Sequence, residues 1–250
     1  MKKTLLAASV FTLGLSGCVS DDHSQFLTAG LTAFQGVTLS KSELQAKASL
    51  SAQQMDSENK LAPKDNKYSQ RLDKLTAGLT QVDGTPLNFQ VYLADEINAF
   101  AMPDGTVRVY SGLMDVMHDD ELVAVIGHEI GHIKYEHSLS QFKTAYMTTA
   151  ARQAATAVGG KAAQLASSEY ADMGAEFMSA QFSQKDELQS DLYGIEILCQ
   201  QKMDPFAAMR AQEVLLKHSG NGGGLFSSHP SSAERINQAR TAAANANCGS

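Results

Sequence analysis

The segment His128-Glu129-Ile130-Gly131-His132 constrains this chain more than any other feature, because its spacing has chemical meaning on a helix. Residues four apart on an α-helix share one face, so the two imidazoles can reach one metal ion. Glu129 lies beside them, where its carboxylate can take a proton from water that the metal activates. The pattern predicts a helix with a zinc site, His128 and His132 as ligands and Glu129 as general base.

The residues around this motif predict a helix that is largely buried. Asp119 or Asp120 is expected to cap its N-terminus, where acidic side chains interact favourably with the helix dipole. His137 follows His132 by five residues and is rotated off the ligand face, so we expect it beside a ligand or at the surface. The apolar positions of the helix are Leu122, Val123, Val125, Ile126, Ile130 and Ile133.

A catalytic zinc site usually has a third protein ligand. The metzincin arrangement requires Gly and His at two later positions, where this chain has Tyr135 and Ser138. A glutamate on a second helix is the alternative, and Glu187 and Asp191 share one face of a predicted helix with many apolar residues. We expect Glu187 to bind zinc and Asp191 to accept the second N–H of a ligand histidine. A solvated acidic helix face is the other interpretation of this spacing.

The remaining pattern predicts an α+β protein that is mostly helical and has a small sheet. Asp104-Gly105 predicts a hairpin turn between two extended runs. Gly159-Gly160 is expected to divide the small-residue region 144–175 into two helices, which we interpret as a cover over the cleft. Strands are expected at 88–93, 99–102 and 106–110, and helices around 39–55, 66–80, 119–133, 175–201 and after 232.

The N-terminus predicts a secreted lipoprotein. Lys2 and Lys3 precede a short apolar run, Leu5–Leu15, which is typical of a signal peptide and too short to span a bilayer. Leu15-Ser16-Gly17-Cys18 resembles the lipobox of bacterial lipoproteins, in which the cysteine is acylated and becomes the mature N-terminus. We therefore expect lipidation of Cys18 and a location in the periplasm.

The charge of the chain limits the kinds of partner that we expect it to bind. A formal net charge of −7 at pH 7, with no basic run, argues against nucleic acid. Acyl chains are expected to hold the protein at a membrane. Val19, rather than Asp, follows Cys18, which by resemblance to sorting in enteric bacteria favours the outer membrane.

The periplasm permits a disulfide between Cys199 and Cys248, and a buried thiol at Cys199 is the alternative.

Five ordered motifs resemble the CaaX prenyl protease (Ste24-like) family of gluzincin metallopeptidases. The likeness covers about residues 25–240 and is greatest with the soluble periplasmic lipoproteins of that family. The chain lacks the hydrophobic spans of the integral-membrane members, so processing of prenylated proteins is not implied. The motifs are Asn98-Ala-Phe-Ala-Met-Pro-Asp-Gly105, Ser111-Gly112-Leu113, His128 to His132, Glu187 to Asp191, and Ser228-His229-Pro230 followed by Arg235.

This resemblance implies a zincin-like fold and roles for several further residues. His229 and Arg235 would stabilise the oxyanion and position the substrate or the glutamate side chains. An edge strand would pair with an extended peptide substrate. The residues of that strand would be Asn98, Ala99, Phe100, Ala101 and Met102. One Zn²⁺ per chain would be held by His128, His132 and Glu187.

The sequence thus predicts a zinc-dependent endopeptidase of the bacterial cell envelope, acting on misfolded or unassembled envelope proteins. Residues 1–17 would be the signal peptide, 18–60 a lipid-anchored tether with an N-terminal helical arm, and 61–245 the zinc metallopeptidase domain. Two other classes remain open. One is a chaperone-like binding protein without turnover, and the other is a structural lipoprotein with an idle zinc site.

Overall fold

The computed structural model describes residues 39–157, 169–218, 225–230 and 232–248, which exclude Cys18 and Gly159-Gly160. The strands are β1 (Gln81–Val82), β2 (Thr85–Pro86), β3 (Asn88–Tyr92), β4 (Ala99–Ala101) and β5 (Thr106–Tyr110). The helices are α2 (Lys41–Glu58), α3 (Lys67–Thr76), α4 (Ser111–Val116), α5 (Asp119–Lys134), α6 (His137–Ala157), α7 (Glu169–Ser179), α8 (Gln184–Gln200), α9 (Ala207–His218), α10 (Leu225–Ser228) and α11 (Ala233–Asn245). The predicted class, mostly helical with a small sheet, is confirmed.

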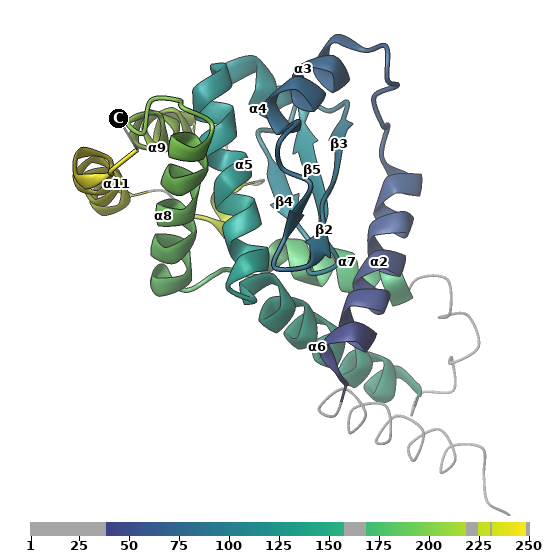
Figure 1. Cartoon of the computed structure of the whole chain (residues 1–250). Coiled ribbons are helices and arrows are strands. Elements are labelled where there is room, and N and C mark those ends of the chain that lie inside the picture. Colours follow the sequence, from purple (N-terminus) through teal and green to yellow (C-terminus); the bar gives the residue numbers. More distant parts are fainter. Residues whose placement is uncertain (1–38, 158–168, 219–224, 231, 249–250) are drawn as a thin grey trace, which may run out of the picture.

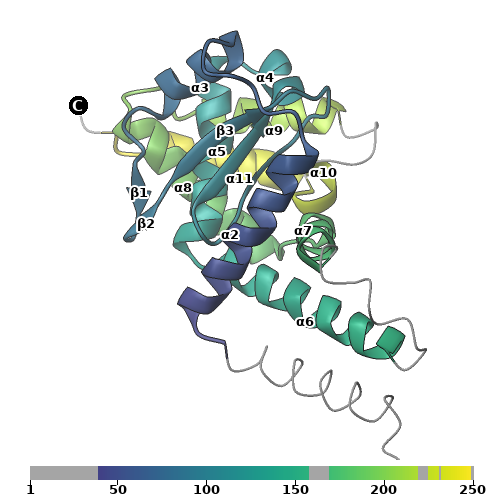
Figure 2. The same cartoon turned by 90° about the vertical axis from the view of Figure 1, so that its right-hand side faces the viewer.

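The elements form layers with α5 at the centre. In Figure 1, α8, α9 and α11 lie on one side of α5, and the sheet lies on the other side. Helix α2 crosses the far face of that sheet, as Figure 2 shows, and α6 and α7 lie below it. Helix α5 therefore lies between a group of helices and the sheet, so its polar side chains can contact residues from both sides.

The three-stranded sheet has the order β3-β5-β4, with β3 parallel and β4 antiparallel to β5. The predicted hairpin between β4 and β5 is therefore confirmed. Its turn needs glycine, because Gly105 has a φ of 94° and a Cβ there would lie 1.9 Å from the carbonyl oxygen of Pro86. Every residue of β5 is buried, since side chains alternate between the face that meets α5 and the face that meets α2.

Helix α2 is attached to the sheet by a polar contact within an apolar cluster. The guanidinium of Arg108 donates twice to Asp56, at 2.8 Å in each bond. The hydroxyl of Tyr92 donates to the same carboxylate at 2.7 Å. The surrounding cluster includes Leu44 of α2, Phe100 of β4, Phe142 of α6 and Met173 and Phe177 of α7. Residues 41–58, which lie within the segment 18–60 expected to form a tether and a helical arm, thus pack on the sheet.

Helices α5 and α8 approach each other closely along a line of small residues. A Cβ at Gly131 would lie 2.9 Å from Cα of Ser190. A Cβ at Gly194 would lie 2.7 Å from the carbonyl oxygen of Ala124. Because real Cβ atoms do not approach other atoms this closely, the glycines permit the helix contact that brings the two motif-bearing helices together.

Three details correct or complete the sequence analysis. The helix expected over 175–201 is two helices, because α7 ends at Ser179 and Ser183 caps α8. The N-cap of α5 is His118, rather than Asp119 or Asp120. Cys199 and Cys248 form a disulfide, which decides between the two alternatives for Cys199. Within the described residues, no helix has both the length and the hydropathy to cross a bilayer.

Candidate metal centre

Helix α5 directs its histidines and Glu129 into the interior. The amide of His118 donates to the carboxylate of Glu121 at 2.9 Å, which satisfies a polar group at the helix N-terminus. His128, Glu129 and His132 then follow with 6%, 2% and 0% of their surface exposed. Since buried polar side chains need partners, the neighbouring elements must supply them.

Helix α8 supplies carboxylates to these histidines. Ser183 accepts a hydrogen bond from the helix N-terminus and so determines where the first turn begins. Glu187 lies in that turn, with Oε1 3.4 Å from Nε2 of His132 and Oε2 3.7 Å from Nε2 of His128. One turn later, Oδ1 of Asp191 lies 2.9 Å from Nδ1 of His128. Glu187 therefore faces the inner side of the histidine pair, and Asp191 the outer side.

The donor atoms fit a zinc ion. Ligand atoms of His128, His132, Glu187 and His229 all lie within 4.8 Å of one another. Nε2 of His128 is 3.0 Å from Nε2 of His132 and 3.2 Å from Nδ1 of His229. Tetrahedral ligands at zinc distances of about 2.0–2.1 Å would be about 3.3 Å apart. The spacing and the mixture of nitrogen and carboxylate donors therefore suit Zn²⁺.

His229 and Arg235 join this cluster from the loop after α10 and from α11. Nδ1 of His229 is 2.8 Å from Oε1 of Glu187, and its Nε2 is 3.6 Å from Oε1 of Glu129. Arg235 donates to both oxygens of Asp191 at 2.9 and 2.7 Å, and its Nη1 is 2.6 Å from Oε2 of Glu187. Arg235 thus holds the two carboxylates of α8 in position.

The environment separates the proton affinities of the two glutamates. Burial raises the pKa of Glu129, although the charges of His229 and His128 oppose this shift. Burial also acts to raise the pKa of Glu187, but the same two histidines outweigh it and hold that pKa far below its ordinary value. Burial lowers the pKa of His132 well below its ordinary value, which favours the neutral imidazole that binds metal. One glutamate is thus suited to accept a proton and the other to stay ionised.

Two more side chains surround His132. Glu136 adopts a φ of 61°, which ends α5 and returns His137 toward the site. The Nδ1 atoms of His137 and His132 are 3.2 Å apart, so His137 contacts the ring nitrogen that faces away from the donor cluster. Phe182 stacks on the ring of His132 with centroids 3.8 Å apart. No motif marks Phe182, and the proximity of His137 depends on a helix break that periodicity does not reveal.

The segment expected to bind substrate forms an edge of the sheet. Within β4, Phe100 forms a hydrogen-bonded pair with Arg108. Because hydrogen bonding alternates along an antiparallel pair, the backbone groups of Ala99 and Ala101 face away from β5. All of Asn98–Met102 is nevertheless buried, with at most 3% of any residue exposed. The edge is therefore covered in this conformation.

Side chains of α6 and α7 provide that cover. The hydroxyl of Ser138 donates to the outward carbonyl of Ala101 at 2.8 Å. A cavity of about 10 Å³ lies between this strand and Glu129, and Phe177 and Met178 of α7 form part of its wall. A cavity of this size is about the smallest that can hold one water molecule. A peptide strand can pair with β4 only if these side chains move.

Comparisons with known proteins identify relatives along nearly the whole chain. The family model described as peptidase family M48 matches residues 63–243. Metalloprotease LoiP of Escherichia coli (strain K12) is 38% identical over 242 residues, which cover 96% of each chain. Metalloprotease YcaL of the same strain is 37% identical over 95% of this chain and 96% of its own. The beta-barrel assembly-enhancing protease of that strain is 29% identical over 64% of this chain and 35% of its own.

Proposed function

From the premise that this chain belongs to peptidase family M48 and is a metalloendopeptidase, we propose that it cleaves misfolded or unassembled proteins of the bacterial cell envelope with the aid of zinc. The convergence of four metal donors beside the buried Glu129 is the observation that carries the chemistry. The lipobox-like run before Cys18 supports the envelope location. Within the family, we assign the chain to the Ste24-like lipoprotein branch.

We assign one Zn²⁺ to His128, His132 and Glu187. Three protein ligands leave a coordination position for water, as catalytic zinc sites require, and His229 is then available as a hydrogen-bond donor. A bound Zn²⁺ supplies a Lewis acid for the scissile carbonyl and lowers the pKa of water. Asp191 and Arg235 hold this arrangement, because Asp191 contacts Nδ1 of His128 and Arg235 contacts both carboxylates of α8.

Glu129 then transfers protons, and His229 donates a hydrogen bond. Glu129 takes a proton from the attacking water and passes it to the leaving amine. Its Oε1 is buried and, within the described residues, has no hydrogen-bond partner, so it is available to that water. His229 donates a hydrogen bond to the developing oxyanion through a ring N–H. Burial of the site keeps bulk water from weakening these interactions.

The substrate is proposed to be an extended peptide that pairs with Asn98–Met102. The outward backbone groups of Ala99 and Ala101 are suited to such β-augmentation. Pairing at Ala101 requires the Ser138 hydroxyl to leave its carbonyl, and pairing along the strand requires Phe177 to move. Unfolded segments meet the need for an extended backbone, which supports misfolded or unassembled proteins as substrates.

The proposed location is the periplasmic face of the outer membrane. Residues 1–17 would be removed, Cys18 would carry the acyl chains, and the tether would end in the arm that contains α2. Residues 61–245 would form the catalytic domain. Nucleic acid is not proposed as a partner, because the chain is acidic and has no basic run.

Incubation with unfolded casein at neutral pH tests this function. Wild-type protein, Glu129→Gln and a chelator-treated sample would be compared, with bound metal measured in each. Of these three samples, we expect only the wild type to cleave casein, with about one zinc bound per chain. Glu129→Gln should lose at least about 100-fold in rate. Glu136→Gln is the matched control, since this nearby carboxylate is 55% exposed and pairs with Lys41.

The outcomes separate the proposed enzyme from its rivals. Stoichiometric zinc and casein binding without cleavage would favour a binding protein. A chain that holds no zinc would contradict the assigned metal centre. Equal cleavage by wild type and Glu129→Gln would remove the general-base role of that residue.

A further inference from the structure

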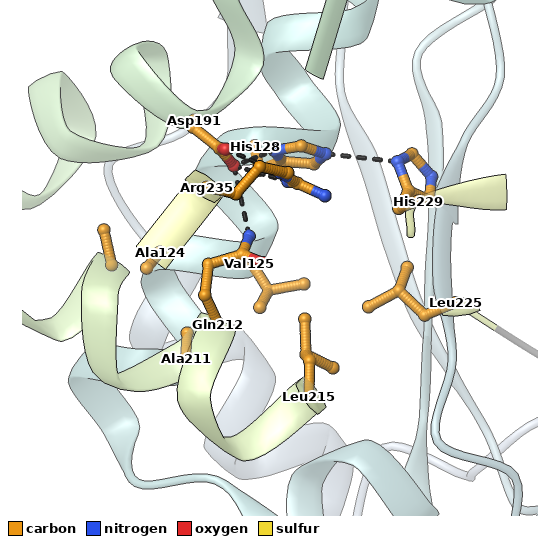
Figure 3. Close-up of a pocket in the computed structure, with 11 residues that line it drawn as sticks. Ala124, Val125, His128, Asp191, Ala211, Gln212, Leu215, Leu225, His229 and Arg235 are labelled. Atoms are coloured by element: carbon orange, nitrogen blue, oxygen red, sulfur yellow. Dashed lines mark hydrogen bonds and ion pairs between the residues drawn. The ribbon is translucent and has the colours of Figure 1, made fainter. Parts of the chain in front are cut away.

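A second cavity lies beside the metal centre, on the side of α9. Its volume is about 20 Å³. Figure 3 shows the apolar side chains of Val125, Leu215 and Leu225 around it, with the rings of His128 and His229 along one side. These residues come from α5, α9, α10 and the loop that follows α10, so the cavity forms where these elements meet.

The position of this cavity relates it to the scissile bond. His229 lines both this cavity and the smaller one that borders Glu129 and β4. His128 lines the larger cavity as well, and its Nε2 is 3.2 Å from Nδ1 of His229. His128 is an assigned metal ligand and His229 the assigned oxyanion donor, so a peptide that runs along β4 and presents its carbonyl to the metal centre and to His229 has a side chain next to the second cavity.

The polar groups that line the cavity are hydrogen-bonded to one another. Gln212 donates to Oδ1 of Asp191 at 3.2 Å, and Arg235 donates to both oxygens of the same carboxylate. His128 contacts that carboxylate too, at 2.9 Å. A charged substrate side chain would have to break this buried network, which costs more than burial of an apolar group.

We infer that the cavity is a subsite for one of the two residues that flank the scissile bond, and that Leu215 and Ala211 of α9 limit it to small aliphatic side chains. This inference rests on the proposed function. A space of about 20 Å³ holds about one water-sized group, so it can take the methyl group of alanine or one methyl group of valine, and it excludes an aromatic ring. The apolar walls favour such side chains by the area that they bury.

Mapping of cleavage sites in unfolded casein tests the subsite. Full-length protein in detergent would be compared with Leu215→Ala, and the residues on both sides of each cut would be identified by mass spectrometry. We expect the wild type to favour alanine and valine at one flanking position. Leu215→Ala should shift the ratio of large to small side chains there by about tenfold, as a change of a few methylene groups allows.

Two further variants separate a change of pocket from a general effect. Leu216→Ala removes the same side chain from the neighbouring position, which is 40% exposed, and should leave the preference unchanged. Ala211→Val narrows the cavity without truncation and should select against valine in favour of alanine. Identical preferences in the wild type, Leu215→Ala and Ala211→Val would overturn the inference.

A binding measurement makes the test independent of turnover. In the Glu129→Gln background, fluorescent peptides with alanine, valine, leucine or phenylalanine at the flanking position would be titrated. We expect Leu215→Ala to tighten binding of the leucine peptide about tenfold relative to the alanine peptide. This shift without casein cleavage by the wild type would support the subsite and contradict the proposed activity. Casein cleavage by the wild type with unshifted peptide affinities would support the proposed activity and contradict the subsite.

Discussion

Oδ1 of Asp191 lies 2.9 Å from Nδ1 of His128, and this contact turns the opposite ring nitrogen toward His132. The same carboxylate accepts hydrogen bonds from Gln212 of α9 and Arg235 of α11, as the dashed lines in Figure 3 show. The orientation of one candidate ligand on α5 is therefore determined by three other helices. A conservative change at Asp191 should therefore weaken metal binding more than it destabilises the fold.

Asp191→Asn should weaken zinc binding about 10- to 100-fold, the range expected for loss of a carboxylate behind a ligand histidine. The amide keeps the shape of the side chain but loses the charge that Arg235 and His128 meet. Competition with a chelating dye would give the affinity, and circular dichroism would report the helix content. Glu196→Gln, at an exposed position of the same helix, is the control. Unchanged zinc affinity in Asp191→Asn would refute the assigned role.

His229→Ala should keep about one zinc per chain and lower kcat about 100-fold or more, as expected for loss of an oxyanion donor. The prediction follows from the assignment of three ligands and one hydrogen-bond donor to the cluster. Metal analysis and casein kinetics on the same preparation would check it. Loss of zinc from this variant, with zinc retained in His218→Ala, would instead make His229 a ligand.

Gly131→Ala should both destabilise the protein and separate the two halves of the metal centre. The new Cβ would lie 2.9 Å from Cα of Ser190, so α8 must shift away from α5 and carry Glu187 with it. Overpacking of this kind typically costs about 1–3 kcal/mol. Chemical denaturation and zinc titration would measure the two effects. Gly78→Ala, which meets no atom within 4 Å, should change neither.

Asp56→Asn should lower the free energy of unfolding by about 2 kcal/mol at pH 7, because it weakens a charged hydrogen-bond pair. Burial opposes ionisation of Asp56, but hydrogen bonds from Arg108 and Tyr92 outweigh it and lower its pKa. The folded state then binds fewer protons than the unfolded chain, so this contribution is complete above the ordinary pKa of about 3.9 and is lost as pH falls through the lower, folded-state pKa.

Urea denaturation at several pH values would check this dependence. The difference between wild type and Asp56→Asn should be constant near neutrality and shrink below about pH 4. Asp73→Asn, at an exposed position of α3, provides the control. A difference that persists unchanged in acid would mean that the charge of Asp56 is not the source of the stabilisation.

Cys248→Ser should destabilise the C-terminal region, since the disulfide with Cys199 spans 49 residues that include Arg235. Closing a loop of this length is worth about 4 kcal/mol in the chain-entropy model. Guanidinium denaturation with and without reductant would measure the loss. The reduced wild type should match Cys248→Ser, and a variant as stable as the oxidised wild type would show that the bond contributes little.

Several features of the fold were predictable because they depend on local backbone geometry. The helical period placed His128, Glu129 and His132 on one helix, and the alternating period and Asp-Gly turn identified the β4–β5 hairpin. The same period put Glu187 and Asp191 on one face of α8. Each of these patterns can be recognised in a short stretch of sequence, because the neighbours involved are at most a few residues apart.

Other predictions failed or were incomplete because they depend on how distant segments pack. The expected helix over 175–201 is interrupted after Ser179, where the chain turns so that Phe182 stacks on His132. The break at Glu136 returns His137 to the same ring. Phe182 contacts a ring that is distant in sequence, and His137 reaches His132 only because the helix ends between them, so helical periodicity reveals neither contact.

The sequence by itself determined which chemical groups the chain offers and on which helical faces they lie, since the period of an α-helix is set by the backbone. Tertiary structure decided which of those groups meet. Close packing at Gly131 and Gly194 brings α8 against α5, and α6 and α7 cover the edge of β4. Such contacts form between residues far apart in the chain, and their energy comes from burial and close packing of whole elements rather than from any local pattern.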